Sequence, residues 1–302
     1  MIRAIVASMT AKTTGPSTGC LELNQAPPTV LRSCYFAAGI SLAYVIFAIG
    51  CCRLILQTWW LRWRNVSPEQ RVHRLRATVS RLCRWYLTYH SRLRLMSLEY
   101  RDKREITHGL IVANHPSLVD ALWILATQPN ACCVLKGDLR QSPLLRSLVE
   151  ELDYVSNHDP EQLLAEGSRR LANGEALLVF PEATRTQPGQ LPEFRLGAAE
   201  LLVRSGAVVH PIVIHKTETY LCKEQAWYQF PRRPMRWRID FMPPQQPDIT
   251  GNARTCRRQI TAQLQAFFHG CLRDNGCTDL ASSGKSAHEH AGATSNGLSG
   301  RV

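Results

Sequence analysis

Two stretches of the 302-residue sequence decide the fold: LIVANHPSLVD at residues 110–120 and ALLVFPEATRT at residues 176–186. In each stretch a short apolar run is followed at once by a polar segment that contains proline. This is the pattern of a buried strand that ends in a loop. From residue 106 to about residue 245, further short apolar runs alternate with segments of helical periodicity. The alternation predicts an α/β fold with a mixed sheet covered by helices.

Six short apolar runs predict the strands, and five longer segments predict the helices that follow them. The expected strands are Leu110–Ala113, Cys132–Leu135, Tyr154–Ser156, Ala176–Phe180, Ala207–Ile214 and Trp237–Met242. The expected helices lie near 117–127, 143–151, 160–172, 195–205 and 252–272.

His115 is expected at a strand-to-helix corner, with Asn114 as a helix cap. Open α/β sheets place their functional sites at such carboxyl ends of strands. Asp120 follows about one turn later, so its carboxylate can reach the imidazole. A carboxylate on one ring nitrogen fixes the tautomer and leaves the other nitrogen as a base. Since histidine titrates at about pH 6.5, it suits removal of a hydroxyl proton. A purely structural hydrogen-bonded corner explains the same spacing.

The second stretch places Glu182, Thr184 and Arg185 directly after a strand. A guanidinium group matches a phosphate through two parallel hydrogen bonds, so this segment is a candidate phosphate cradle. A carboxylate does not bind phosphate, and Glu182 is therefore expected to orient Arg185 or a hydroxyl group. The alternative is a surface turn that carries one Glu–Arg pair.

Four ordered blocks resemble the glycerolipid acyltransferases of the lysophosphatidic acid acyltransferase type. Asn-His-x4-Asp at 114–120 and Phe-Pro-Glu-x-Thr-Arg at 180–185 carry most of the resemblance. Phe-Arg-Leu-Gly-Ala-Ala at 194–199 and Val-Val-His-Pro-Ile-Val-Ile at 208–214 are similar to two further blocks of that family. The resemblance covers about residues 70–245.

The resemblance implies transfer of an acyl chain from a thioester of coenzyme A or acyl carrier protein to the free hydroxyl of a lysophospholipid, such as lysophosphatidic acid. It implies His115 as general base and Asp120 as its orienting partner, with no covalent acyl-enzyme, resident cofactor or metal. A backbone N–H near the histidine would stabilise the thioester oxyanion. The residues implied to bind the acceptor phosphate are Glu182, Thr184, Arg185 and Arg195.

The sequence departs from the family pattern at two positions. Ala183 stands where the Phe-Pro-Glu-Gly-Thr-Arg block has glycine; if this position needs a positive φ, alanine costs about 1 kcal/mol. Asn157 stands where the family has an arginine, and Lys136 or Arg140 is expected to compensate. Asn114 and Lys136 are accessory site residues on this interpretation. Two alternatives stay open: an acyltransferase for a specialised lipid, such as those of aryl-polyene pathways, and a non-catalytic lipid-binding or scaffold relative.

An uncharged apolar run from Cys34 to Cys52 predicts a membrane helix. Nineteen helical residues reach about 28 Å, close to a bilayer core of roughly 30 Å. Trp59, Trp60 and Trp63 follow, and tryptophan favours the membrane interface. Arginines are more frequent after the run than before it, which favours a catalytic domain on the cytoplasmic side of an inner or cytoplasmic membrane. A buried or interfacial helix that does not cross is the alternative.

The chain is thus divided into five expected parts. They are a flexible leader (1–33), a transmembrane or membrane-embedded helix (34–60), a basic amphipathic helical region (61–103), an acyltransferase domain (104–275) and a disordered tail (276–302). Within the third part, an amphipathic helix is expected over residues 67–100, with a basic face suited to a membrane surface.

Composition narrows the classes of partner. The net charge of +12 and the 45% of hydrophobic residues exclude a wholly disordered chain and indicate an anionic partner. The basic residues cluster beside the apolar run without interleaved stacking aromatics, which favours an acidic membrane over nucleic acid. The eleven cysteines contain no C-x-x-C pair, so reduced thiols and no metal site are expected.

Overall fold

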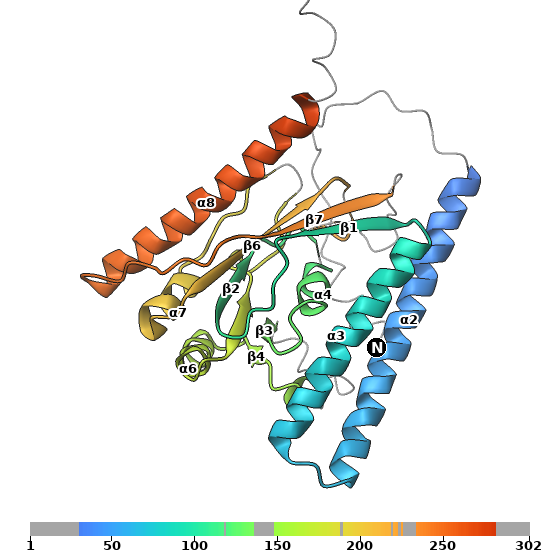
Figure 1. The fold of residues 1–302 in the computed structure, drawn as a ribbon, viewed down its shortest axis with the longest axis horizontal. Coiled ribbons are helices and arrows are strands. Elements are labelled where there is room, and N and C mark those ends of the chain that lie inside the picture. The colour runs from blue at the N-terminus through green and yellow to red at the C-terminus, as the bar shows by residue number, and fades with distance from the viewer. Residues whose placement is uncertain are drawn as a thin grey trace, which may run out of the picture.

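In the computed structural model, a seven-stranded sheet lies between helices, and a long helical hairpin flanks it (Figure 1). This confirms the predicted mixed α/β fold. The described residues are 30–117, 119–135, 148–187, 190–218, 220–222, 225 and 234–281. The predicted leader up to residue 29, Lys136 and Arg140, and the tail from residue 282 lie outside them.

The sheet is mostly parallel. Its strands are β1 (Met96–Arg101), β2 (Gly109–Ala113), β3 (Cys132–Leu135), β4 (Val155–Ser156), β5 (Ala176–Val179), β6 (Val209–Lys216) and β7 (Met235–Phe241). Their spatial order is β1-β7-β6-β2-β5-β3-β4. Only the β6–β7 pair is antiparallel, so β1 and β7 run opposite to the other five strands.

The register places three strand ends side by side. β2 lies between β5 and β6 and is parallel to both, with Val112 paired to Val179 and Ala113 paired to Ile212. Parallel neighbours end at the same edge of a sheet, so the segments that follow β2, β5 and β6 meet there. This edge carries the candidate site.

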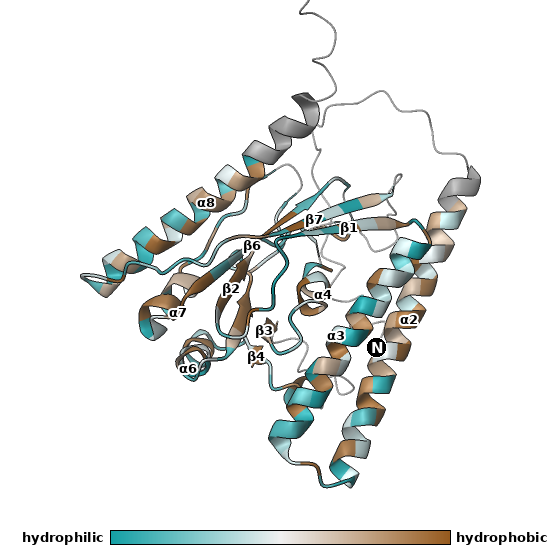
Figure 2. Ribbon diagram, viewed as in Figure 1, coloured by the Kyte–Doolittle hydropathy of each residue, from teal (hydrophilic) through white to brown (hydrophobic). Residues whose placement is uncertain are grey.

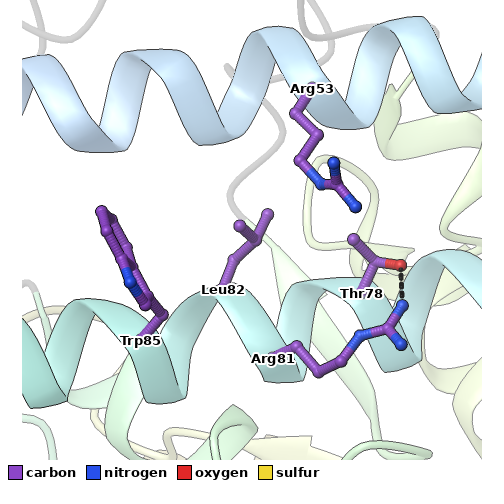
Figure 3. A pocket seen from close by; sticks show the side chains of 5 residues that line it. All are labelled: Arg53, Thr78, Arg81, Leu82 and Trp85. Atoms are coloured by element: carbon purple, nitrogen blue, oxygen red, sulfur yellow. Dashed lines mark hydrogen bonds between the residues drawn. The ribbon is translucent and has the colours of Figure 1, made fainter.

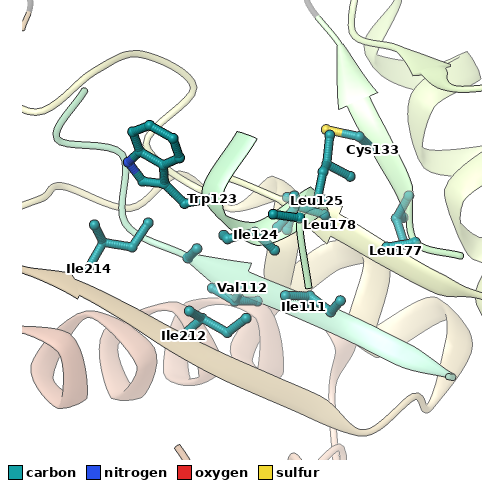
Figure 4. Close-up of a cluster of buried hydrophobic side chains, with 14 of the residues drawn as sticks. Ile111, Val112, Trp123, Ile124, Leu125, Cys133, Leu177, Leu178, Ile212 and Ile214 are labelled. Carbon is teal, nitrogen blue, oxygen red and sulfur yellow. The ribbon is translucent and has the colours of Figure 1, made fainter. Parts of the chain in front are cut away.

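Strands β2 and β5 are buried along their whole length. Such strands show no alternation of polar and apolar residues because helices cover both faces of the sheet. The helices are α3 (Pro68–Arg92) and α4 (Asp120–Leu125) on one side, and α6 (Pro160–Ala172), α7 (Gly197–Ser205) and α8 (Ala253–Ala281) on the other. Figure 4 shows the core between them, with Trp123 of α4 above Val112 and Ile212.

The predicted helix over 67–100 is wrong at its end. Helix α3 stops at Arg92, Arg94 adopts a positive φ of 51°, and residues Met96–Arg101 form strand β1 beside β7. The strand has the sequence MSLEYR, which alternates apolar and polar side chains as a half-buried strand requires. Helix α8 continues to Ala281, past the boundary expected at residue 276.

Helix α2 (Val30–Trp63) is longer than the predicted apolar run and pairs with α3 as an antiparallel hairpin (Figure 1). Two tyrosine hydroxyl groups link the start of α2 to the end of α3. Tyr35 donates to the carbonyl of Leu93 at 2.7 Å, and Tyr89 donates to the carbonyl of Gly39 at 2.9 Å. These two hydrogen bonds join α2 to α3 at this end of the hairpin.

Close to the turn between α2 and α3, buried Arg76 links the hairpin to the sheet domain. Its Nε donates to the carbonyl of Leu152 and its Nη2 to the carbonyl of Asp153, both at 2.9 Å. Glu151 adds ion pairs to Arg62 at 2.7 Å and to Arg71 at 2.9 Å. These contacts hold the hairpin against the sheet domain.

Helix α2 carries many hydrophobic residues (Figure 2), and several of them form an exposed apolar face. Leu42, Ile49, Leu56 and Trp63 recur every seven residues, and their exposed fractions are 50%, 63%, 67% and 76%. An 18-residue window within the segment Cys34–Trp63 has a mean hydropathy of 2.1, and the segment is long enough to cross a membrane by length and composition. Contiguous exposed apolar surface of this kind marks contact with a membrane or with another protein.

Candidate active site

The corner after β2 holds an imidazole–carboxylate pair. Nδ1 of His115 lies 3.2 Å from Oδ2 of Asp120, and the same oxygen accepts the N–H of Ser117 at 2.6 Å. Asp120 is fully buried, whereas the His115 side chain is 17% exposed. A carboxylate accepts only, so Nδ1 carries the proton and Nε2 keeps a lone pair on a partly exposed ring.

Asn114 does not cap a helix. Helix α4 starts at Asp120, with Val119 at the cap position and no side-chain cap hydrogen bond. The buried Asn114 amide instead pairs with the backbone of Ile214: Nδ2 donates to the carbonyl at 2.9 Å, and Oδ1 accepts the N–H at 2.7 Å. This pair extends the β2–β6 ladder by one step and fixes the backbone that carries His115.

Glu182 joins the two predicted loops. Its Oε1 accepts the N–H of His115 at 2.7 Å, and its Oε2 accepts the hydroxyl of Thr186 at 2.6 Å. The N–H of Thr186 donates to the carbonyl of His115 at 2.9 Å, and the ring of Phe180 stacks on the imidazole with centroids 4.3 Å apart. Burial raises the pKa of Glu182. Glu182 thus orients the hydroxyl of Thr186, which agrees with one of the two roles predicted for it, and it also positions the backbone of His115.

Both carboxylate oxygens of Glu182 accept hydrogen bonds from protein groups. The prediction that Glu182 binds the phosphate is therefore corrected: its carboxylate holds the loop after β5 against the loop after β2. The alternative of a Glu182–Arg185 surface pair also fails. Nη1 of Arg185 donates instead to the carbonyls of Leu221 and Cys222, at 2.8 and 2.9 Å. Burial lowers the Arg185 pKa, and the negative charge of Asp120 acts in the opposite direction. The guanidinium therefore lies within electrostatic reach of the imidazole–carboxylate pair.

The segment after β6 forms a third wall that the sequence interpretation missed. The hydroxyl of Ser117 donates to the carbonyl of Tyr220 at 2.8 Å, and Nζ of Lys216 donates to the carbonyl of Pro116 at 2.7 Å. Leu221 adopts a φ of 49°, which turns successive carbonyls toward Ser117 and Arg185. The signal was the predicted strand ending at Ile214, because a third parallel strand brings its own loop to the same edge.

The remaining predicted residues lie around this centre. Thr184 and Arg195 are exposed, and the N–H of Arg195 donates to the carbonyl of Pro181 at 2.9 Å, which holds the start of α7 beside the loop. The N–H groups of His115 and Ser117 are already donated to carboxylates. These two groups therefore do not supply the oxyanion donor that was expected near the histidine.

Ala183 adopts a φ of 57°, the left-handed conformation anticipated from the missing glycine. We expect Ala183→Gly to raise the free energy of unfolding by up to about 1 kcal/mol, because glycine relieves the Cβ strain and returns part of the gain as unfolded-chain entropy. Chemical denaturation of both proteins measures the difference. The matched control is Gly206→Ala at the end of α7, where φ is 65° and the nearest atom to an added Cβ is 3.9 Å away. The free energy of unfolding of this control variant should fall by about 1 kcal/mol. Equal losses in both variants would contradict the strain argument.

The fold and the paired loops define a class: an α/β protein with a solvent-facing imidazole, backed by a buried carboxylate and flanked by an arginine. Residues 97–215 match the family model described as Acyltransferase. The chain is thus similar to this acyltransferase family over that segment, and its curated relatives are named 1-acyl-sn-glycerol-3-phosphate acyltransferases.

Three relatives illustrate the similarity. The chain is 27% identical over 159 residues to the 1-acyl-sn-glycerol-3-phosphate acyltransferase of Limnanthes douglasii, covering 50% of this chain and 54% of the relative. It is 25% identical over 178 residues to that of Helicobacter pylori, covering 56% and 69%. It is 25% identical over 124 residues to the human alpha form, covering 38% and 44%. The matches thus span about half the length of these relatives.

The crystal structure of the 1-acyl-sn-glycerophosphate acyltransferase PlsC from Thermotoga maritima has a similar fold. Its TM-score is 0.58 at 21% sequence identity, over 80% of this chain and 95% of that chain. The likeness extends beyond the matched domain and includes most of the described elements.

Proposed function

We propose that this chain is an O-acyltransferase that moves an acyl chain from a thioester of coenzyme A or acyl carrier protein to the hydroxyl of a lysophospholipid. One observation carries the proposal: a buried carboxylate holds Nδ1 of His115 while the imidazole side chain stays partly exposed. An imidazole so held is poised as a general base rather than as a structural hydrogen bond between two buried groups.

The proposed reaction needs no covalent enzyme intermediate. Nε2 of His115 takes the proton of the acceptor hydroxyl as its oxygen attacks the thioester carbonyl. The carbon–sulfur bond then breaks, and the imidazolium returns the proton to the leaving thiolate, which gives an ester and a free thiol. Asp120 stabilises the transient imidazolium. Burial raises the pKa of the Cys83 and Cys133 thiols to about 12, so neither is a nucleophile near neutral pH.

Arg185 is the proposed anchor for the acceptor phosphate. Its Nη1 is held by two carbonyls, which fixes the plane of the guanidinium and prepares its remaining N–H groups for a doubly hydrogen-bonded phosphate. Exposed Thr184 and Arg195, on the same loop and at the adjoining helix start, complete the cradle. The acceptor hydroxyl would then lie over His115.

We propose that the hairpin attaches the enzyme to a membrane by lying in the interface rather than by crossing. Helix α3 packs along α2 and carries Arg74, Arg81, Arg84 and Arg92. If α2 crossed the bilayer, these arginines would enter the hydrocarbon, at about 2.5 kcal/mol or more each. In the interface, the apolar face of α2 is buried and the basic side chains reach the headgroups. The cytoplasmic side is proposed from the arginine distribution.

The direct test is transfer of a labelled acyl group by the purified protein with phospholipid vesicles. The donors are acyl-CoA and acyl carrier protein, and the acceptors are lysophosphatidic acid, lysophosphatidylcholine and monoacylglycerol. Ester formation above the rate without enzyme supports the proposal. Absence of transfer from both donors to all acceptors, by protein that remains folded, would indicate the non-catalytic lipid-binding alternative.

Asn157 stands where the family has an arginine, and this difference favours a different class of acceptor. Activity on acceptors other than lysophosphatidic acid, without activity on lysophosphatidic acid itself, would support the specialised-lipid alternative.

Arg185→Ala should raise KM for lysophosphatidic acid about 10- to 100-fold, because a charge-assisted phosphate contact of roughly 1.5–3 kcal/mol is lost. Monoacylglycerol, which has no phosphate, is the internal control, and its KM should rise several-fold at most. Initial rates against acceptor concentration give both values. Equal losses on the two acceptors would show that Arg185 supports the fold of the site instead of binding phosphate.

A further inference from the structure

A cationic hollow lies between α2 and α3, outside the candidate active site. Figure 3 shows its lining, and its volume is about 450 Å³. Arg53 reaches in from α2, and Arg81 lies on α3 with its Nη2 donating to the hydroxyl of buried Thr78 at 2.9 Å. Leu82 and the half-exposed indole of Trp85 form the remaining wall. Two guanidinium groups thus share one hollow that has an apolar side.

Arg53 stands out along its helix. It is the single charged residue of α2 between Arg32 and Arg62, and it borders the uncovered apolar face. Arg62 and Arg71 form ion pairs with Glu151, and Arg76 forms one with Asp153 at 3.9 Å; within the part of the chain that the structure describes, no ion pair involves Arg53 or Arg81. An arginine in such an apolar setting is costly unless an anion or water meets it.

We propose that this hollow binds the phosphate headgroup of an anionic membrane phospholipid, distinct from the substrate. The inference rests on the interfacial attachment proposed above. The phosphate lies between Arg53 and Arg81, the Trp85 indole occupies the headgroup level, and the acyl chains run along the apolar face of α2. The combination of two cations with adjoining apolar surface matches an amphipathic phosphate. A small inorganic anion would leave the apolar wall uncovered.

The test is vesicle binding without any catalytic readout. The full chain is titrated with neutral phosphatidylcholine vesicles and with vesicles that contain one-fifth phosphatidylglycerol. The variant R53Q/R81Q removes both charges, and R53K/R81K keeps the charges without the planar fork. The matched control R254Q/R258Q removes the same two charges from exposed positions on α8, on the opposite side of the molecule (Figure 1).

We expect wild type to bind the anionic vesicles more tightly, and R53Q/R81Q to lose about tenfold or more of that preference. The control R254Q/R258Q should keep it, and R53K/R81K should lie between. Equal losses in R53Q/R81Q and R254Q/R258Q would overturn the proposal in favour of general charge attraction. So would equal binding of both vesicle types by wild type. Inorganic phosphate added to the anionic vesicles is a further arm: displacement of the protein by millimolar phosphate would show a simple anion site instead. Failure of wild type to bind either vesicle would reject membrane attachment itself.

Discussion

Replacing His115 with alanine should lower kcat for acyl transfer by about 10²–10⁴-fold, the range that a positioned general base contributes. The variant loses the group that accepts the hydroxyl proton but keeps the acceptor contacts, so KM for the acceptor should change little. The imidazole also stacks on Phe180, with centroids 4.3 Å apart, and alanine leaves that contact empty at a partly exposed position. Steady-state rates with both substrates varied measure the separation of kcat from KM.

The chain offers its own matched control for this experiment. His269 stands five positions before Asp274, the same spacing as His115 and Asp120. On α8, however, Nε2 of His269 lies 2.7 Å from the carbonyl of Pro192, as a structural histidine would. His269→Ala should therefore keep kcat within a few-fold of wild type. If His115→Ala keeps a comparable rate while remaining folded, His115 is not the base.

The sequence was sufficient to predict the parts of the site that depend on local order. An apolar run that ends in Asn-His-Pro predicts a strand followed by a corner, and Asp120 is close enough along the chain to reach the imidazole. The run before Phe180 predicts the second strand in the same way. Because each inference needs only a few neighbouring residues, both strands are found in the structure, each with one end shifted by one position.

The roles of Asn114 and Glu182 could not be predicted in this way. Asn114 pairs with a residue 100 positions away, and Glu182 accepts an N–H from a residue 67 positions away. Those contacts follow from the strand order, in which β2 lies between β5 and β6. Periodicity in one segment carries no information on which strands become neighbours. The same reason hides the wall formed by Leu221 and Cys222.

The hairpin shows a second limit of local pattern. An apolar run of 19 residues favours a crossing helix when it is considered alone. The structure adds a basic helix packed along it, and this neighbour makes an interfacial position the better proposal. The strand Met96–Arg101 was missed for a related reason, because the helical pattern before it was extended across an alternation of only six residues.

Asp120→Asn should lower kcat by about 10²-fold or more while leaving the backbone of the corner in place. Oδ2 of Asp120 accepts both Nδ1 of His115 and the N–H of Ser117, and Oδ1 has no hydrogen-bond partner among the described residues. The asparagine oxygen can take the Oδ2 position and keep both bonds. Its NH₂ then occupies the place of Oδ1, and the negative charge that stabilises the imidazolium is gone.

The two consequences can be measured separately. A buried NH₂ group without an acceptor costs about 1–3 kcal/mol, which chemical denaturation detects. The loss of charge affects kcat but not KM, since Asp120 is fully buried and does not touch the acceptor. Asp159→Asn is the matched control: Asp159 caps α6 by accepting the N–H of Glu161 at 2.9 Å, and asparagine caps equally well. This control should keep full activity. If Asp120→Asn loses stability but retains kcat, the carboxylate serves only to build the corner, and the electrostatic role assigned to it is wrong.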